Sequence, residues 1–129
     1  MIAPHLRTML LADANVAAYF STRVYWGKLP QQPTWPAITL EQVSSNPHNA
    51  LNSLPGLLWS RVRIHAWGST YEMANAGAML IETALNGATY TTTGLVVRSV
   101  VAQGLRDFYE PAVEAFHVSQ DFSIWHSTA

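Results

Sequence analysis

The densest group of residues that could carry chemistry lies near the end of the chain, in the stretch RDFYEPAVEAFHVSQDFSIWH at residues 106–126. The chain has seven Lys and Arg and eight Asp and Glu, and five of these fifteen side chains fall within residues 106–121. Two histidines and a tryptophan accompany them. Acids beside histidines could hold a metal ion or exchange protons with a substrate. The same side chains, on a strand and the segment leading into it, could instead contact another protein.

The spacing of these residues does not favour a metal site. His117 and Asp121 share one face of a predicted strand, but four strand residues separate them by roughly 13 Å. His65 could pair with His117 across a sheet, which would leave only two of the three or more ligands that such a site needs. We therefore predict no metal ion and no cofactor, and we interpret the histidines as surface or interface residues.

Catalytic arrangements are also missing. The candidate nucleophiles fall within predicted strands, without the sharp turn that exposes a nucleophilic serine; they are Ser99, Ser119 and Ser123. Pro111 favours an extended backbone at Glu110, which argues against a helical pairing of Glu110 with Glu114 for acid–base work. The absence of cysteine excludes thiolate chemistry and disulfides. We predict that the protein is not an enzyme.

The length of 129 residues fits one domain, which we expect to span residues 1–129. Charged residues make up 12% of the chain, about half the usual share of roughly 25%. Together with five Trp and five Tyr, this indicates that a partner covers part of the surface. A net charge of −1 provides no long-range attraction to nucleic acid or anionic membranes. No apolar run approaches the roughly 18 residues of a membrane helix, so we expect a soluble protein made in the cytoplasm.

Hydrophobic periodicity predicts the α+β class, in the order α-β-β-β-α-β-β. Helical spacing predicts a first helix over about 3–12 and a short helical turn over about 14–20. Alternating or β-branched segments predict strands at 24–26, 38–44, 58–67, 95–103 and 116–125. We expect an antiparallel or mixed sheet of about four to five strands with helices packed on it. The polar stretch 44–56, with Pro47, Pro55 and Gly56, is expected to be a long functional or mobile loop.

The strongest helix signal follows the strand at 58–67. Ser69 and Glu72 form an S-x-x-E pattern, which predicts a capping box at the helix start. Asn86-Gly87 supplies a left-handed stop. Between them lies one predicted apolar stripe, made of Tyr71, Ala74, Ala78, Ile81 and Leu85.

The strand at 58–67 has two different faces. Its apolar face holds Val62, Ile64 and Ala66, and the opposite face holds Arg61, Arg63, His65 and Trp67. Cations beside a ring could bind a single-stranded nucleic acid, but three cations without a surrounding basic field bind it weakly. The alternative is that this face meets acidic residues across the sheet or on a neighbouring subunit.

Three segments in order resemble a known family. The first, LRTMLLADANVAAYFSTRVYWGKLPQQPTWPAITLEQVS, carries "LLAD…V" and "RVY.G.LPQ"; the second, SRVRIHAWGSTYEMANAGAMLIETALNG, carries "W…TY" and ends in "LNG". The third, RDFYEPAVEAFHVSQDFSIWH, carries "D.YEP" and "DF.IWH". In their order and spacing they resemble the tail completion proteins of long-tailed, non-contractile bacteriophages, also described as tail-to-head joining or tail terminator proteins. The 44–56 loop is the least similar stretch, and His65 stands where a small or acidic residue is expected.

The resemblance implies a virion protein at the head–tail interface, assembled in the host cytoplasm. It implies a subunit that forms a ring, most often of six copies, on the end of the tail tube, where the ring stops polymerisation and offers a surface to the head connector. The implied partners are further copies of the chain, the tail tube protein and a head–tail connector or stopper protein. Genome DNA would pass through the lumen without specific binding. The family has no catalytic residues to carry over.

We predict contacts with a sister subunit or a partner in three regions: the 44–56 loop, the polar face of the strand at 58–67, and residues 106–114. The candidate residues are Pro47, His48, Asn49, Arg61, Arg63, His65, Trp67, Arg106, Asp107, Tyr109 and Glu110. Two alternatives stay open: another head–tail connector or tube component, and a small ligand-binding or enzymatic α+β domain.

Overall fold

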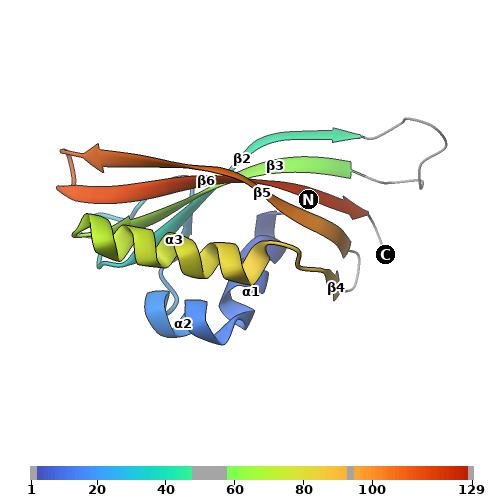
Figure 1. Cartoon of the computed structure of the whole chain (residues 1–129), viewed down its shortest axis with the longest axis horizontal. Coiled ribbons are helices and arrows are strands. Elements are labelled where there is room, and N and C mark those ends of the chain that lie inside the picture. Colours follow the sequence, from blue (N-terminus) through green and yellow to red (C-terminus); the bar gives the residue numbers. More distant parts are fainter. Residues whose placement is uncertain (1–2, 48–57, 93–94, 128–129) are drawn as a thin grey trace.

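A computed structural model of the chain describes residues 3–47, 58–92 and 95–127. These residues form one mixed sheet with helices on one of its faces, which confirms the predicted α+β class (Figure 1). The elements in chain order are α1 (Ala3–Ala12), α2 (Ala14–Phe20), β1 (Val24–Trp26), β2 (Ala37–Pro47), β3 (Leu58–Gly68), α3 (Tyr71–Leu85), β4 (Tyr90–Thr92), β5 (Leu95–Glu110) and β6 (Ala115–Ser127). None of the helices within these ranges is long and apolar enough to cross a membrane.

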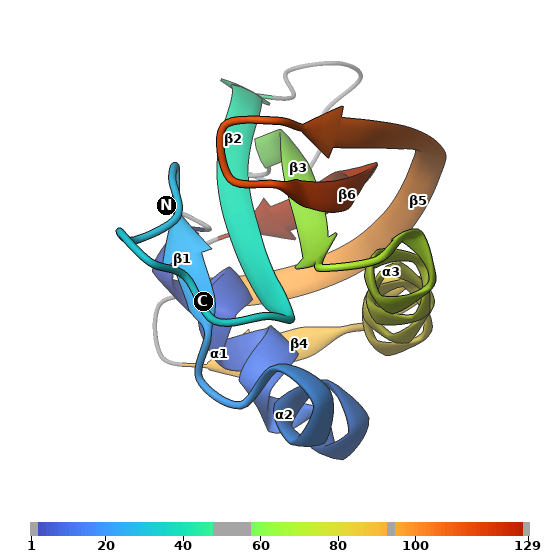
Figure 2. The ribbon, with the colours of Figure 1, turned by 90° about the vertical axis from the view of Figure 1, so that its left-hand side faces the viewer.

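The sheet has the strand order β1-β2-β3-β6-β5-β4. β1 and β2 are parallel and every other neighbouring pair is antiparallel. β3 and β6 form the centre, with eleven paired residues from Leu58↔His126 to Gly68↔Phe116. The sheet twists strongly along its length, as an end-on view shows (Figure 2). The predicted mixed sheet is therefore correct, and it has six strands rather than four to five.

Three strands differ from the prediction for reasons of pairing. β2 was expected to end at residue 44, but its ladder with β3 continues to Pro47↔Leu58, so the first residues of the expected 44–56 loop are strand. β4 was not expected from the sequence; it forms by pairing with the first residues of β5. β5 was expected to end at residue 103, before Gly104 and the charged residues that follow. It continues to Glu110 because its ladder with β6 extends to Glu110↔Ala115. Only the partner strand, and no local pattern, keeps this charged segment extended.

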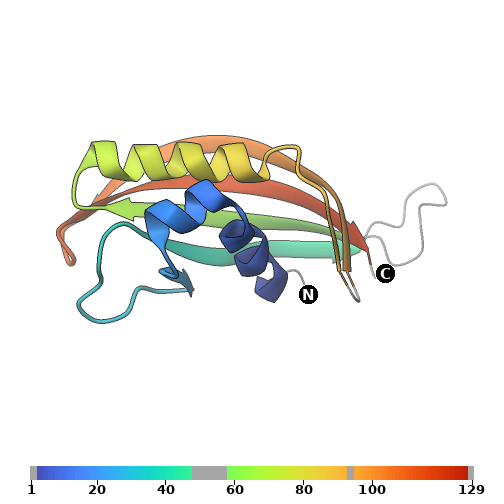
Figure 3. The ribbon, with the colours of Figure 1, turned by 90° about the horizontal axis from the view of Figure 1, so that it is seen from below.

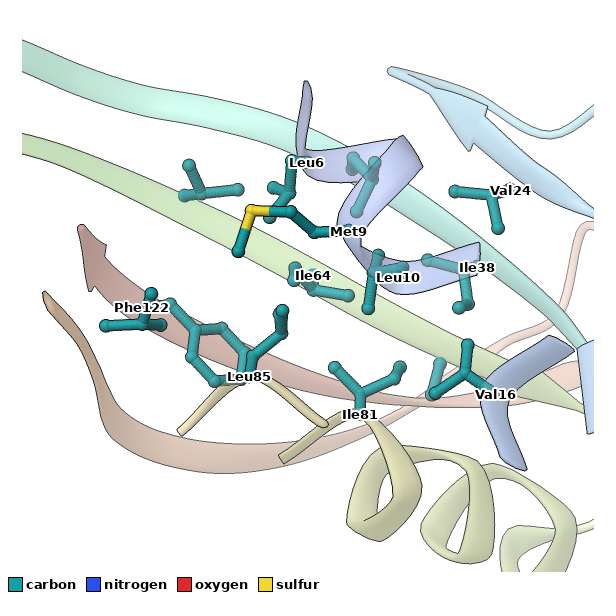
Figure 4. Close-up of a cluster of buried hydrophobic side chains, with 14 of the residues drawn as sticks. Leu6, Met9, Leu10, Val16, Val24, Ile38, Ile64, Ile81, Leu85 and Phe122 are labelled. Carbon is teal, nitrogen blue, oxygen red and sulfur yellow. The ribbon is translucent and has the colours of Figure 1, made fainter. Parts of the chain in front are cut away.

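The three helices cover one face of the sheet: α3 lies against β3 and β6 and also reaches β5, and α1 and α2 lie beside it toward β2 (Figure 3). Apolar side chains from all three helices meet those of the strands in one core (Figure 4). Leu6 and Leu10 of α1, Ile81 of α3, and Ile64 and Phe122 of the sheet are each at most 1% exposed. Because only one sheet face is covered in this way, the opposite face, which we call the outer face, carries the polar side chains.

The start of α3 differs from the predicted capping box. Thr70, not Ser69, is the N-cap, and its Oγ1 accepts a hydrogen bond from the Met73 backbone N–H at 3.2 Å. β3 continues to Gly68, which shifts the helix start by one residue. Tyr71 is 40% exposed and does not join the predicted apolar stripe. The predicted left-handed stop is confirmed at Gly87, where φ is +79°.

Gly77 sets the distance between α3 and α2. A Cβ added at Gly77 would lie 2.5 Å from Cζ of Phe20, a ring that is 0% exposed and has no room to move. The Tyr19 hydroxyl donates a hydrogen bond to the Met73 carbonyl at 2.9 Å, which fixes the two helices at this close approach. The glycine is therefore required by helix–helix contact.

We expect Gly77→Ala to lower the free energy of unfolding by about 1–3 kcal/mol, because overpacking outweighs the roughly 1 kcal/mol that alanine gains in a helix. Chemical denaturation of both chains measures this. Gly104→Ala is the matched control, because an added Cβ there meets nothing within 4 Å and its φ is not positive. A Gly77→Ala chain at least as stable as the natural one would show that α2 adjusts freely.

Candidate partner-binding surface

The outer face is organised around one carboxylate on the central strands. Asp121 of β6 accepts hydrogen bonds from Arg63 Nε at 2.8 Å and from Arg61 Nε at 3.0 Å. Arg63 also lies 3.5 Å from Glu41 of β2. The hydrogen bond from Arg63, aided by Arg61, lowers the pKa of Asp121 although partial burial opposes the shift. The arginines therefore meet acidic residues across their own sheet, one of the two arrangements expected from the sequence.

Next to these ion pairs the outer face becomes aromatic. The rings of His65 and His117 lie 5.0 Å apart, edge to face, and Trp67 lies 4.2 Å from His117. Trp67 donates a hydrogen bond from Nε1 to Thr39 Oγ1 at 2.9 Å and stacks on Trp35 at 6.0 Å. These contacts lock the tryptophan in place, so it is not a free ring for stacking with a nucleic acid base.

The two histidines are neutral at physiological pH. Burial lowers the pKa of His65, against the opposing effect of Glu41, and His65 is 18% exposed. Burial and the neighbouring His65 lower the pKa of His117 to about 4, while Glu110 opposes the shift. Nδ1 of each ring is buried without a partner in the part of the chain that the structure describes. Two neutral, partly buried rings act as packing groups rather than as proton donors.

A groove of about 250 Å³ lies on the outer face where β5 curls over β3 and β6. Its residues come from the ion-pair cluster, the histidine pair and the far half of β5: Arg61, Arg63, His65, Gln103, Gly104, Leu105, Arg106, Phe108, His117, Ser119 and Asp121. Three arginines face a single aspartate within it. The groove is thus polar and basic on one wall and apolar at Phe108, whose ring stacks on His117 at 4.9 Å.

The described residues include no metal-binding group, and an unexpected serine–histidine pair among them is buried. No group of three or more His, Asp or Glu in those ranges could hold a metal ion. A Ser60–His126 hydrogen bond of 2.7 Å was not expected from the sequence. Both side chains face the core and are at most 2% exposed. No substrate can reach this pair, so it satisfies buried polar atoms instead.

The structure separates the predicted contact residues into groups. Arg61, Arg63, His65 and Trp67 share the outer face, as expected, but each is held by neighbours within the chain. In β5, alternation divides the other candidates between two faces. Arg106 lines the outer-face groove, whereas Tyr109 lies 4.9 Å from Phe116. On the helix side, Asp107 raises the pKa of Tyr71.

The remaining candidates are at the end of β2 and the end of β5. Pro47 is the last residue of β2, and Glu110 is the last residue of β5. His48 and Asn49 lie outside the described residues. Three residues of this surface were not among the predicted contact residues. Two are the acids of the ion pairs, Asp121 and Glu41, and the third is Phe108, which lines the groove. A β5–β6 hairpin that turns at residues 111–114 pairs Phe108 with His117. Predicting that hairpin from the sequence would have identified Phe108 as a neighbour of His117.

Comparison with known proteins then decides the family. A family model described as "Tail completion protein gp17" matches residues 4–127 of the chain. The chain belongs to the tail completion protein gp17 family. This membership covers nearly all described elements, from α1 to β6. It indicates a structural role in a phage tail, and therefore a place in the virion and association with other virion components.

A solved structure contains a chain with the same fold. A chain from the structure titled "Virion of native gene transfer agent (GTA) particle" aligns with a TM-score of 0.70 at 18% identity, covering 95% of this chain and 91% of that chain. At this identity the likeness shows the fold alone. Among the curated proteins, none matches this chain.

The neutral histidine pair predicts a specific pH dependence of stability. In the unfolded chain a histidine gains its proton near pH 6.5, whereas folded His117 gains it near pH 4. Between these values the unfolded state binds more protons, so stability falls as the pH falls from 6.5 to 4. Replacing His117 by Asn should reduce this loss by about 2 kcal/mol, which is less than the full difference between the two pKa values implies because solvent screens the half-buried ring. Urea denaturation across that pH range measures the change.

Phe108→Leu is the matched control for this experiment. It removes the ring that stacks on His117 but keeps the imidazole and its partly buried position. We expect the slope of stability against pH to persist in this variant. An unchanged slope in His117→Asn would contradict the assignment of the proton to His117.

Proposed function

We propose that the protein forms a ring of six copies on the end of the tail tube. The ring terminates tube polymerisation and joins the tail to the head connector or stopper protein, at the head–tail interface of the virion. Genome DNA passes through its lumen without specific binding. The single observation that carries this proposal is the tail completion family match over residues 4–127.

Two features of the chain support a role in assembly. The net charge of −1 suits a channel that DNA traverses without being held. The outer-face ion pairs are made within the chain and the two outer-face histidines are neutral, which suits a surface that packs rather than one that carries out a reaction. A ring that binds the tube end but offers no further site for tube subunits would stop polymerisation in the way the proposal requires.

Within this function the outer-face groove is the proposed contact with a partner protein of the tube or connector. Its arginines outnumber Asp121, which favours an acidic segment of the partner. Arg106 is exposed, and its side chain makes no ion pair among the residues described. It is therefore the arginine most available to a partner.

Deleting the gene in the particle-producing strain tests the main proposal. We expect negative-stain electron microscopy of the lysate to show filled heads beside unattached tails, some of abnormal length. A complementing copy of the gene should restore joined particles. Normal, joined particles in the deletion strain would contradict the proposal, and heads with no tails of any length would indicate a tube component instead.

The same strain tests the groove. A complementing chain with Arg106→Glu should fold normally, because the side chain is exposed, but it should restore at least tenfold fewer joined particles than the natural chain. Lys28→Glu is the matched control, since it reverses an exposed cation that does not line the groove. Equal rescue by both variants would remove the groove from the partner contact.

A further inference from the structure

The far half of β5 is an open edge of the sheet. β4 pairs only with Leu95–Val97, and the connection after α3 closes the next part: Gly87 N–H donates to the Val100 carbonyl at 2.8 Å, and Ala102 N–H donates to Asn86 Oδ1 at 3.1 Å. From Gly104 to Glu110 the only strand beside β5 in the described chain is β6. A seven-residue length of this strand edge therefore has no described neighbour.

The opposite side of the sheet has a matching open edge on β2. β1 pairs with Ile38–Leu40, and Gly27 N–H donates to the Leu40 carbonyl at 2.8 Å. Beyond this point, Glu41–Pro47 has β3 on one side and no strand on the other within the described ranges. This edge is also seven residues long. β5 and β2 end at opposite ends of the molecule, so the open edges lie at diagonally opposite corners (Figure 1).

Alternation identifies which backbone groups face outward. In an antiparallel ladder every second residue turns both its N–H and its C=O away from the partner strand. Ala102 is one of these outward-facing residues, because its N–H donates to Asn86 and not to β6. The register shift between Ala102 and Gly104 inserts one extra residue in β5, so beyond it the odd-numbered residues face outward. Leu105, Asp107 and Tyr109 follow as the outward-facing residues. On β2, Leu40 faces outward because its carbonyl accepts a hydrogen bond from Gly27 N–H. Two residues further along, Gln42 therefore also turns its N–H and C=O away from β3.

The two edges are complementary in direction. β2 is antiparallel to β3, β3 to β6, and β6 to β5, so β5 runs antiparallel to β2. When a second copy in the same sheet orientation stands beside β5, its β2 meets β5 as an antiparallel pair. Both backbones then gain hydrogen-bond partners that neither has alone.

Exposed apolar side chains concentrate on the two strands that carry these edges, and four of them lie within the edges themselves. Eight large apolar side chains are exposed among the described residues, and five of them lie on β5 and β2: Val43, Val101, Leu105, Phe108 and Tyr109. Tyr109 is 52% exposed and Leu105 is 48% exposed, each on a strand that carries outward backbone groups. A partner strand on these edges would cover both the outward backbone groups and the exposed apolar side chains.

We propose that the open edge of β5, Gly104–Glu110, pairs with the open edge of β2, Glu41–Pro47, of a second copy of this chain. The contact is head to tail, because two different edges meet, and such contacts close into rings when the rotation between copies permits. This inference rests on the proposed ring and names the surface that builds it. The sheets of neighbouring copies become one continuous sheet.

Proline at outward-facing positions tests the pairing, since it removes a donor from the open side and leaves the internal ladder intact. We expect the natural chain to assemble, and Leu105→Pro and Gln42→Pro each to be monomeric, by analytical ultracentrifugation. Mixing the two variants should give dimers and nothing larger, because one intact β5 meets one intact β2. Leu105→Thr, which keeps the N–H, is the matched control and should assemble.

Each other outcome has one meaning. Rings formed by both proline variants would overturn the edge pairing and leave the ring itself standing. Dimers of Gln42→Pro alone would show β5 pairing with β5, which also overturns the proposal. A natural chain that stays monomeric at every concentration would remove the ring from the proposed function. Loss of assembly in Leu105→Thr would show that side chains, not the backbone, carry the contact.

Hydrogen exchange of the natural chain keeps the test valid if a proline variant fails to fold. The amides of Leu105, Asp107 and Tyr109 should exchange at least tenfold more slowly in the assembly than after dilution to monomers. Equal exchange in both states would overturn the inference.

Discussion

The antiparallel register between β3 and β6 is the constraint on which the rest of the structure depends. It pairs Val62 with Phe122 on the core face and Arg63 with Asp121 on the outer face. Because side chains alternate across a strand, a slip of one residue would send the arginines into the core and the apolar residues to the outside. The hydrophobic core and the ion-pair cluster therefore enforce the same register from opposite faces.

That register also explains why Asp121 and His117 of the outer face interact with neighbouring side chains of the same chain. Asp121 is 15% exposed and carries hydrogen bonds from two arginines, so its charge is stabilised as long as both remain. His117 is surrounded by His65, Trp67 and Phe108, which favour its neutral form. The groups that looked most reactive in the sequence are instead the ones that hold neighbouring strands together. This agrees with a structural role in a phage tail.

The surface available for assembly arises at the ends of the sheet rather than at its centre. β1 and β4 are each three residues long, and each covers only the beginning of its longer neighbour. Among the described residues, the last seven of β2 and the last seven of β5 are left as open edges, and β5 adds exposed apolar side chains such as Phe108. The short flanking strands, together with the connection after α3, leave two edges of equal length that run in opposite directions. The proposed ring uses this property of the sheet.

The sequence by itself determined the fold class, most helices and strands, and the two faces of β3, because local periodicity encodes which side chains are buried. It also carried the resemblance to the tail completion family, which the family match confirms. It could not determine that β5 continues to Glu110, because Gly104, Arg106 and Asp107 have no strand pattern of their own and depend on pairing with β6. Nor could it show that Gly77 accommodates Phe20 or that Asp121 joins two arginines. These features, like the open edges themselves, depend on contacts between residues distant in sequence, and only the tertiary structure decides such contacts.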